Sequence, residues 1–278
     1  MNKCYVFSKV AVLALILPVA AEAKDWRLVP FAGVQYKNLQ FDQQLSGFQG
    51  LPAGDSGKLD VDLPTAELGV RFVYRDFLVA LKYNHSFEQK TDSDVPFTNS
   101  QTAVTRTDLT FTLGYKLWRG LGVFLGYLDG ETELTPDPDP LFNNGSGNAA
   151  WQQQELGGPT YRQTYDEAGW FLGVGYGWPI GQAGLLSLSG AYASMDGGYK
   201  DNFVVGEDFK YEGDSTGYSL ALNWSGGIST HLGYYVDLRR QAYGFEGDNK
   251  AGNQDFANTS VETEEVMTSI TGGLEYRF

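Results

Sequence analysis

The chain has 278 residues, of which 14% are aromatic, 35 are glycine and only 3 are methionine, a composition that favours strands and turns over helices. Beyond residue 25, no stretch approaches the ~18 consecutive apolar residues that would indicate a membrane-spanning helix. The formal net charge is -14 at pH 7 and the basic residues form no stripe, which argues against nucleic acid as a partner.

The first residues predict a cleaved export signal. Two lysines, Lys3 and Lys9, precede an apolar stretch at 10–20, and residues 21–23 (AEA) fit a signal-peptide cleavage site. The apolar stretch is too short to cross a membrane, which disfavours the alternative of an N-terminal anchor. Residues 1–23 are therefore expected to be removed together with Cys4, the only cysteine. The mature protein, residues 24–278, then has no disulfide and no thiolate ligand.

After the signal, apolar and polar residues alternate with a period of two in one segment after another. In 109–117, large apolar residues occupy the odd positions and Thr, Gly or Lys the even ones, so a strand here has one oily face and one polar face. The alternation, interrupted by turn residues, predicts ten strands that are long enough for tilted membrane crossings. They are expected at 26–40, 61–74, 77–90, 104–117, 121–134, 165–178, 185–195, 214–224, 228–244 and 264–278.

The composition of the two strand faces indicates which face meets lipid. The second face collects Gly, Ala and Ser beside charges of both signs, as in a crowded polar lumen, so we expect the oily face to point outward. Tyr and Trp near strand ends fit aromatic girdles at the membrane interfaces. The alternative is a soluble sandwich or lipocalin-like barrel with its oily face inward.

The connections between the predicted strands alternate between short and long. Short links are expected at 75–76, 118–120, 179–184 and 225–227, and long segments near 41–60, 91–103, 135–164, 196–213 and 245–263. Outer-membrane barrels alternate short periplasmic turns with longer extracellular loops. We therefore expect an all-β, antiparallel, up-and-down transmembrane β-barrel of ten strands, with five long extracellular loops and both ends in the periplasm. Eight or twelve strands are the alternatives.

The last strand carries the most specific motif. Leu274, Tyr276 and Phe278 share one face, and the chain ends on an aromatic residue. This pattern resembles the terminal signature of bacterial outer-membrane β-barrel proteins, without indicating a subfamily. The resemblance implies a location in the outer membrane, contact with its lipid and lipopolysaccharide, and recognition of these three residues by the barrel-assembly machinery.

Charges of both signs fall on the predicted inner face. A ten-stranded barrel is narrow, and charges shielded from water need partners, so we expect ion pairs that largely block the bore. The alternative is a narrow, selective channel lined by the same charges. These residues are Arg27, Glu67, Arg71, Lys82, Asp108, Lys116, Asp237, Arg239, Glu275 and Arg277.

The predicted extracellular segments are acidic. In 129–167 and in 245–265, carboxylates far outnumber basic residues, so this end is expected to attract cations or a basic partner. No stretch matches a calcium-binding loop, and neither a metal site nor a cofactor is predicted. Aromatic residues of the predicted loops, Phe41 among them, are candidates for adhesion or for packing the loops together.

Catalytic residues are scarce, because the chain has only 2 histidines. His85 and Ser86 are adjacent in a predicted strand, so their side chains point to opposite faces and do not form a dyad. His231 is expected on the inner face near the periplasmic end of its strand, a poor place for an extracellular active site. Omptin proteases also have ten strands, but their Asp-x-His motif has no match here. We therefore predict no catalytic residue.

These patterns predict a non-enzymatic outer-membrane protein with acidic surface loops that serves envelope integrity, adhesion or ligand binding. A narrow porin-like channel for ions or small solutes is the first alternative. A hydrolase of the outer membrane, either a protease or a lipid A hydrolase, is the second. The extracellular ligand stays unidentified, because loops carry the specificity of such proteins.

Overall fold

The computed structural model of the protein describes residues 25–46, 55–92, 101–136, 162–204, 207–249 and 259–278. The predicted signal, residues 1–23, lies outside these ranges. No helix in the described part is long and apolar enough to cross a membrane. The elements are β1 (Trp26–Ser46), β2 (Asp55–Tyr74), β3 (Phe77–Ser86), β4 (Gln89–Asp92), β5 (Gln101–Trp118), β6 (Leu121–Pro136), β7 (Gln163–Pro179), the 3-10 turn η1 (Gly181–Ala183), β8 (Leu185–Val204), β9 (Glu207–Gly227), β10 (Leu232–Asn249) and β11 (Ser260–Tyr276).

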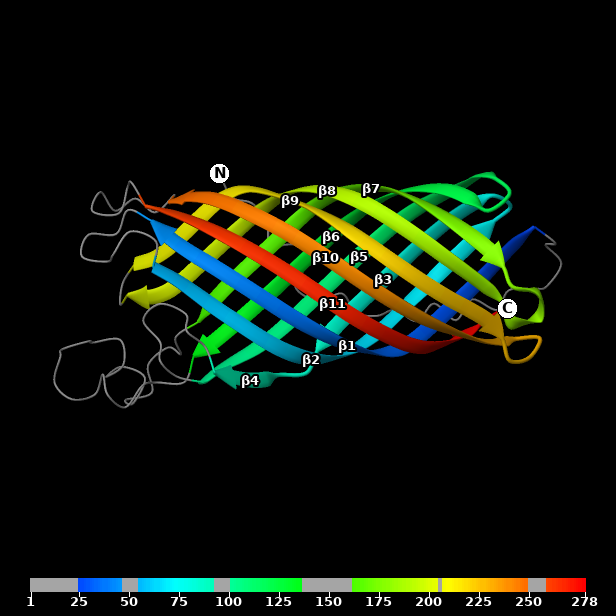
Figure 1. Ribbon diagram of the computed structural model, residues 1–278, viewed down its shortest axis with the longest axis horizontal. Helices are drawn as coiled ribbons and strands as arrows, with labels where there is room; N and C mark the ends of the chain where they lie inside the picture. Colours follow the sequence, from blue (N-terminus) through cyan, green and yellow to red (C-terminus); the bar gives the residue numbers. More distant parts are fainter. Residues whose placement is uncertain (1–24, 47–54, 93–100, 137–161, 205–206, 250–258) are drawn as a thin grey trace.

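The strands form one closed antiparallel barrel (Figure 1). The chain ends close the ring, because β1 pairs with β11 from Phe31 opposite Glu275 to Ser46 opposite Ser260. β3 and β4 are two pieces of a single barrel strand, since both pair with β5, so the 11 strands make a ten-stranded barrel. The predicted all-β barrel and its strand number are confirmed.

Short connections gather at one end of the barrel, here called the turn end. They span 75–76, 119–120, 180–184 and 228–231. Both ends of the described chain lie here as well, since Arg75 N donates to Asp25 O and Phe278 N donates to Leu28 O. The opposite end is called the far end. The connections differ from the prediction in two places. β9 continues to Gly227, so its turn follows at 228–231 instead of 225–227, and only residues 205–206 separate β8 from β9, where a long segment was expected.

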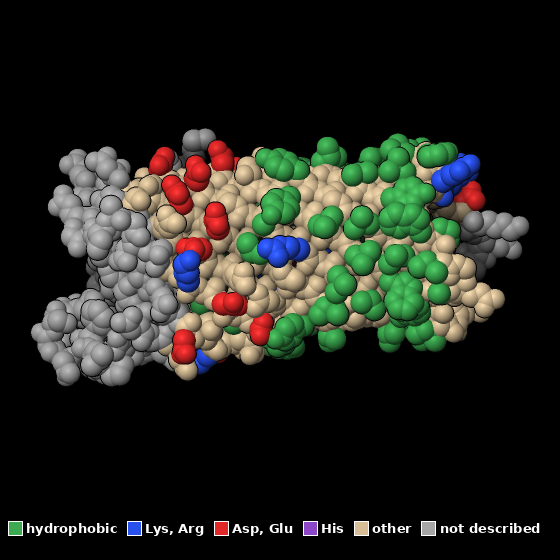
Figure 2. Space-filling model, in the orientation of Figure 1, with side chains coloured by type: hydrophobic (Ala, Val, Ile, Leu, Met, Phe, Trp, Pro, Cys, Tyr) green, Lys and Arg blue, Asp and Glu red, His purple; other side chains and the backbone are tan. Residues whose placement is uncertain are grey.

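The turn-side half of the outer wall is a belt of apolar side chains (Figure 2). On β7 the outward residues between Ala168 and Trp178 include Trp170 and Leu172, which are 55% and 63% exposed. A tilted strand rises about 2.5 Å per residue along the barrel axis, so the ten steps from Ala168 to Trp178 give a belt about 25 Å tall. This is the height of the lipid-facing band of outer-membrane barrels. The oily face therefore points outward here, as predicted.

In the far half of the barrel, the two faces exchange their character. On β2, Asp60 and Asp62 point outward, whereas Leu59, Val61 and Leu63 point inward and are buried. The strand alternation continues without interruption, and only the polarity of its two faces is swapped. The far half is thus built like a soluble barrel, with a polar outer wall and an apolar interior.

The apolar interior of the far half is a continuous cluster, here called the plug. The Tyr165 ring packs edge-on against Phe41 and Phe245, with centroid distances of 5.6 and 5.5 Å. The plug corrects two predictions, because the lumen is not polar throughout and Phe41 is a core residue instead of a loop residue. Its members are Leu39, Phe41, Leu59, Val61, Leu63, Val104, Leu128, Leu134, Tyr165, Ala193, Met195, Tyr199, Tyr211, Tyr243, Phe245, Val261 and Met267.

The strands also extend further toward the far end than predicted. β8 ends at Val204 and β9 begins at Glu207, so the segment 196–213 is mostly strand and not a long loop. Likewise, β1 continues to Ser46, well beyond the predicted end at residue 40. The physical reason is the exchanged polarity, because outward polar residues at this height resemble those of a loop.

Candidate functional site

On the turn side of the plug, the interior holds five buried charged residues, here called the upper charge layer. Its members are Lys37, Arg106, Asp108, Glu167 and Glu265. Asp108 accepts two hydrogen bonds of 2.8 Å, one at Oδ2 from Lys37 Nζ and one at Oδ1 from Arg106 Nε. Arg106 Nη1 also lies 2.7 Å from Glu265 Oε1, and these two side chains are 1% and 0% exposed. Strands that are distant in the sequence are therefore joined across the bore by desolvated ion pairs.

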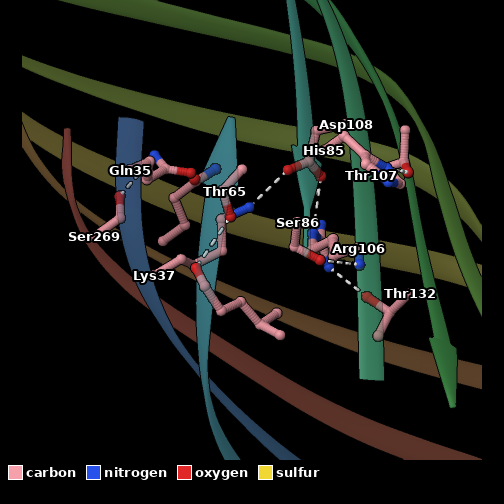
Figure 3. A network of polar contacts seen from close by, with 12 residues as sticks. Gln35, Lys37, Thr65, His85, Ser86, Arg106, Thr107, Asp108, Thr132 and Ser269 are labelled. Carbon is pink, nitrogen blue, oxygen red and sulfur yellow. Dashed lines mark hydrogen bonds and ion pairs between the residues drawn. The ribbon is translucent and has the colours of Figure 1, made fainter. Parts of the chain in front are cut away.

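Uncharged side chains complete the hydrogen bonding at this height (Figure 3). Arg106 Nη1 donates to Thr132 Oγ1 at 2.8 Å, and the backbone N of Arg106 donates to Ser86 Oγ at 2.7 Å. Nearby, Gln35 Nε2 donates to Ser269 Oγ at 3.2 Å. These bonds satisfy groups that burial would otherwise leave unpaired. The layer is thus a fixed partition across the barrel.

Glu167 is the exception in this layer, because no cation of the described chain lies within ion-pair distance of it. Its Oε1 accepts hydrogen bonds from Tyr165 OH at 2.7 Å and from Ser215 Oγ at 2.6 Å. Its Oε2 is buried and has no hydrogen-bond partner. The carboxyl group is therefore held by neutral donors on one oxygen only.

A second group of charges, the lower charge layer, lies nearer the turn end and is organised around two buried carboxylates. Glu67 accepts Tyr235 OH at 2.8 Å and pairs with Lys82 Nζ at 3.3 Å. Glu275 pairs with Arg71 Nη1 at 2.9 Å and with Arg277 Nε at 3.0 Å. The layer comprises Glu67, Arg71, Lys82, Tyr235, Asp237, Arg239, Glu275 and Arg277, with Asp237 and Arg239 paired at 3.3 Å.

Most of the predicted lumen charges, eight of the ten, belong to these two layers. The other two, Arg27 and Lys116, are exposed near the turn end, so the prediction of shielded lumen charges is wrong for them. Four further charges are buried in the upper layer but were not predicted to face the lumen, and two of them, both glutamates, lie in segments that were predicted to be acidic loops. The four residues are Lys37, Arg106, Glu167 and Glu265.

The plug and the charge layers together fill the bore. Described residues from β1, β2 and β5 through β11 contribute to the plug, so it meets nearly the whole circumference of the barrel. Packed aromatic rings and mostly paired charges of the described residues occupy the bore at these heights, where a channel would require water. The described interior at these heights is therefore packed like a protein core.

The outer wall of the far half carries exposed carboxylates, here called the acidic wall (Figure 2). Lys58, Arg162, Lys200 and Lys210 pair with some of its members. Burial, followed by repulsion from Asp166, raises the pKa of the Asp129 and Glu131 carboxyl groups. The wall consists of Asp42, Asp60, Asp62, Asp129, Glu131, Glu133, Asp166, Asp196, Glu212, Asp214, Glu246, Asp248, Glu262 and Glu264.

A groove of about 440 Å³ opens in the acidic wall across β9, β10, β11 and β1. Gly244 lies in its lining, where a Cβ atom would meet nothing within 4 Å. No group of His, Cys, Asp and Glu side chains in the described ranges is arranged to hold a metal ion. The carboxylates that line the groove are Asp42, Asp214, Glu246, Glu262 and Glu264. The groove is therefore lined by carboxylates from all four of these strands.

The two histidines do not form a hydrolytic site with their described neighbours. His85 is exposed on the outer wall, where Nδ1 lies 2.9 Å from Thr107 Oγ1, while Ser86 points inward and is buried. This confirms that the two side chains lie on opposite faces. His231 lies in the turn between β9 and β10 and contacts Arg277 O through Nδ1 at 3.0 Å, so its predicted place on the inner face of a strand is wrong.

Comparison with known proteins supports the fold. No protein-family model and no curated protein matches the sequence. The outer membrane protease OmpT from Escherichia coli has 12% identity, a TM-score of 0.55, and coverage of 91% of this chain and 97% of that one. Two other solved structures have lower TM-scores. The Pseudomonas putida toluene transporter TodX has 9% identity and a TM-score of 0.32, with 92% of this chain and 90% of that one covered. The attachment invasion locus protein Ail of Yersinia pestis has 12% identity and a TM-score of 0.29, with 91% of this chain and 99% of that one covered. The chain has the fold of bacterial outer-membrane β-barrels.

Proposed function

We propose that this chain is a non-enzymatic outer-membrane protein that is closed to solutes and binds a cationic partner through its acidic wall. The observation that carries the proposal is the filled bore, in which the plug and the charge layers leave no path for a solute. A protein of this kind acts through its surface. Neither described histidine is hydrogen-bonded to a carboxylate that would orient it as a general base, because His85 contacts Thr107 Oγ1 and His231 contacts Arg277 O, and this argues against a hydrolase.

The proposal includes an orientation in the membrane. The apolar belt contacts lipid, the turn end faces the periplasm, and the far half stands outside among the lipopolysaccharide head groups. Leu274, Tyr276 and Phe278 point outward at the turn end, 53%, 44% and 68% exposed, where the barrel-assembly machinery would read them. Export through the signal at residues 1–23 completes this route.

The acidic wall supplies the binding surface. Its carboxylates are carried by strands and not by loops. The backbone positions of these residues, and so their spacing, are therefore fixed before a partner binds. A rigid field of one sign attracts an oppositely charged partner over about a Debye length and speeds its association. A lysine- or arginine-rich segment is the partner that this wall fits.

The first test concerns the bore. Purified protein in a planar lipid bilayer is expected to give no stable conductance. The matched comparison is the variant Phe41→Ala/Phe245→Ala, which removes two rings from the plug and is expected to conduct more than the wild type does. Steady openings of the wild-type protein that change on Arg71→Gln or Lys82→Gln would contradict the proposal and favour a channel.

The second test concerns the wall. An oligolysine peptide is expected to bind the wild-type protein in vesicles and to bind at least tenfold more weakly after Asp214→Asn, Glu246→Gln and Glu262→Gln are combined. The matched control neutralises Asp25 and Asp76 at the turn end and is expected to bind as the wild type does. Equal affinity of all three proteins would refute binding by the wall.

A further inference from the structure

The charges of the upper charge layer do not balance. The layer has two cations, Lys37 and Arg106, but three carboxyl groups, those of Asp108, Glu167 and Glu265. All five residues are buried. An uncompensated charge in such an environment is costly, and a carboxyl group there generally becomes neutral instead.

The ion pairs use up both cations on two of the carboxylates. Asp108 is shared by Lys37 and Arg106, each at 2.8 Å. Both oxygens of Glu265 accept Arg106 Nη1 at 2.7 Å. Asp108 is therefore stabilised as an anion. Glu265 has Arg106 as its counter-charge, although burial raises the pKa of its carboxyl group to about 7, and the remaining acid has no counter-charge.

Glu167 is that remaining acid. It receives only the neutral donors Tyr165 and Ser215, and only on Oε1. Its bare, buried Oε2 would carry half of the negative charge if the group were ionised. In the neutral acid, the bare atom is a carbonyl oxygen, which costs much less to leave unpaired.

The other groups around Glu167 do not supply the missing positive charge. Tyr243 approaches from β10 as a neutral phenol, and Tyr165 belongs to the same strand as Glu167. Within the lower charge layer, cations outnumber carboxylates by one, but the Arg277 side chain is 34% exposed and is compensated by solvent. Arg239 is engaged by Asp237 at 3.3 Å.

We propose that Glu167 is a proton-binding site, which holds one proton at neutral pH and thereby neutralises the upper charge layer. In the unfolded chain the same carboxyl group ionises above about pH 4.3, so the folded protein binds one proton more. Linkage gives the sign: this contribution to stability is complete at low pH and is lost as the pH rises toward deprotonation of the folded state. Deprotonation places an unpaired anion against the aromatic plug and loosens the far half.

The test compares the wild type with Glu167→Gln, which keeps the shape of the side chain and removes the titration, and with the exposed control Glu88→Gln. The unfolding equilibrium constant is measured in urea with lipid vesicles between about pH 6 and pH 8. For each pH unit, we expect the unfolding equilibrium constant of the wild type and of the control to increase by a factor ten times larger than that of Glu167→Gln. Equal slopes for all three proteins would overturn the proposal.

A second measurement needs no variant to fold. Infrared spectra of the wild type labelled with ¹³C-glutamate are expected to contain a protonated glutamic acid band at neutral pH. A spectrum with ionised glutamate bands alone would overturn the proposal. A bound metal cation is the competing way to neutralise the layer, and a tenfold loss of stability when sodium is replaced by a bulky organic cation would favour it.

Discussion

Replacement of Arg106 by methionine is expected to destabilise the barrel severely. Arg106 donates to Asp108 at 2.8 Å, to Thr132 at 2.8 Å and to both oxygens of Glu265 at 2.7 Å. After the substitution Asp108 keeps Lys37, but Glu265, which is 0% exposed, keeps no cation. Leaving one buried partner without its counter-charge costs about 3–5 kcal/mol, which corresponds to a factor of roughly 10² to 10⁴ in the unfolding equilibrium constant.

The assay is reversible urea unfolding of the protein in lipid vesicles, followed by tryptophan fluorescence. The matched control is Arg75→Ala, which removes an exposed pair with Asp25 at 3.1 Å and is expected to cost less than about 1 kcal/mol. The double variant Arg106→Met/Glu265→Gln removes the stranded charge and is expected to recover more than half of the loss. A cost for Arg106→Met no larger than that of the control, or no recovery in the double variant, would refute the reasoning.

Three further predictions concern the belt, the plug and the acidic wall. Leu172→Arg, in the middle of the belt, is expected to lower the free energy of unfolding in vesicles by about 2–4 kcal/mol. Asp214→Arg, on the outer wall above the belt, is expected to change it by less than about 0.5 kcal/mol. Similar losses for the two variants would contradict the lipid contact of the belt. Phe245→Ala is expected to cost about 3–5 kcal/mol because it empties the centre of the plug, and a cost below about 1 kcal/mol would contradict its packing. Asp166→Asn is expected to lower the pKa of the Glu131 carboxyl group, measured by NMR titration, because it removes the repulsion between the two carboxylates. The variant is expected to be more stable than the wild type at neutral pH but not in acid, where both carboxyl groups are protonated. An unchanged pKa of Glu131 would contradict the repulsion.

The part of the fold within the belt was predictable from the sequence. There the oily face of each strand is exposed to lipid, so a period-two pattern such as that of residues 109–117 marks both the strand and its outward face. Most short links were also predictable, because turn residues interrupt the pattern at 75–76 and 180–184. Only the register near 228–231 was misplaced.

The far half was not recognised, because periodicity alone does not say at which height the surroundings change from lipid to water. Asp60 looked like a loop residue, although Leu59 and Val61 on either side of it continue the strand. If the alternation of β7 is continued beyond the belt, Glu167 falls on the face that points into the barrel, together with Gly169 and Phe171. Its acidic surroundings in the sequence instead favoured a solvated loop.

The pairing inside the barrel could not be derived from one sequence. Arg106 and Glu265 are 159 residues apart, and their contact depends on the closure of the barrel and on strand register. The sequence predicted that charges in the lumen must pair, but it did not identify the partners, because each inward charge has several possible neighbours across a narrow bore.

The defining feature of this barrel is that apolar side chains meet lipid in one half and fill the interior in the other. Residues 25–278 contain no cysteine, so single spin labels can be attached through Leu222→Cys or Asp214→Cys, at positions that are both exposed on the outer face of β9. Depth-sensitive electron paramagnetic resonance in vesicles is expected to find Leu222 accessible to oxygen and shielded from a water-soluble nickel complex, with the reverse at Asp214. Equal exposure of both labels to the nickel complex would show that no membrane surrounds the belt.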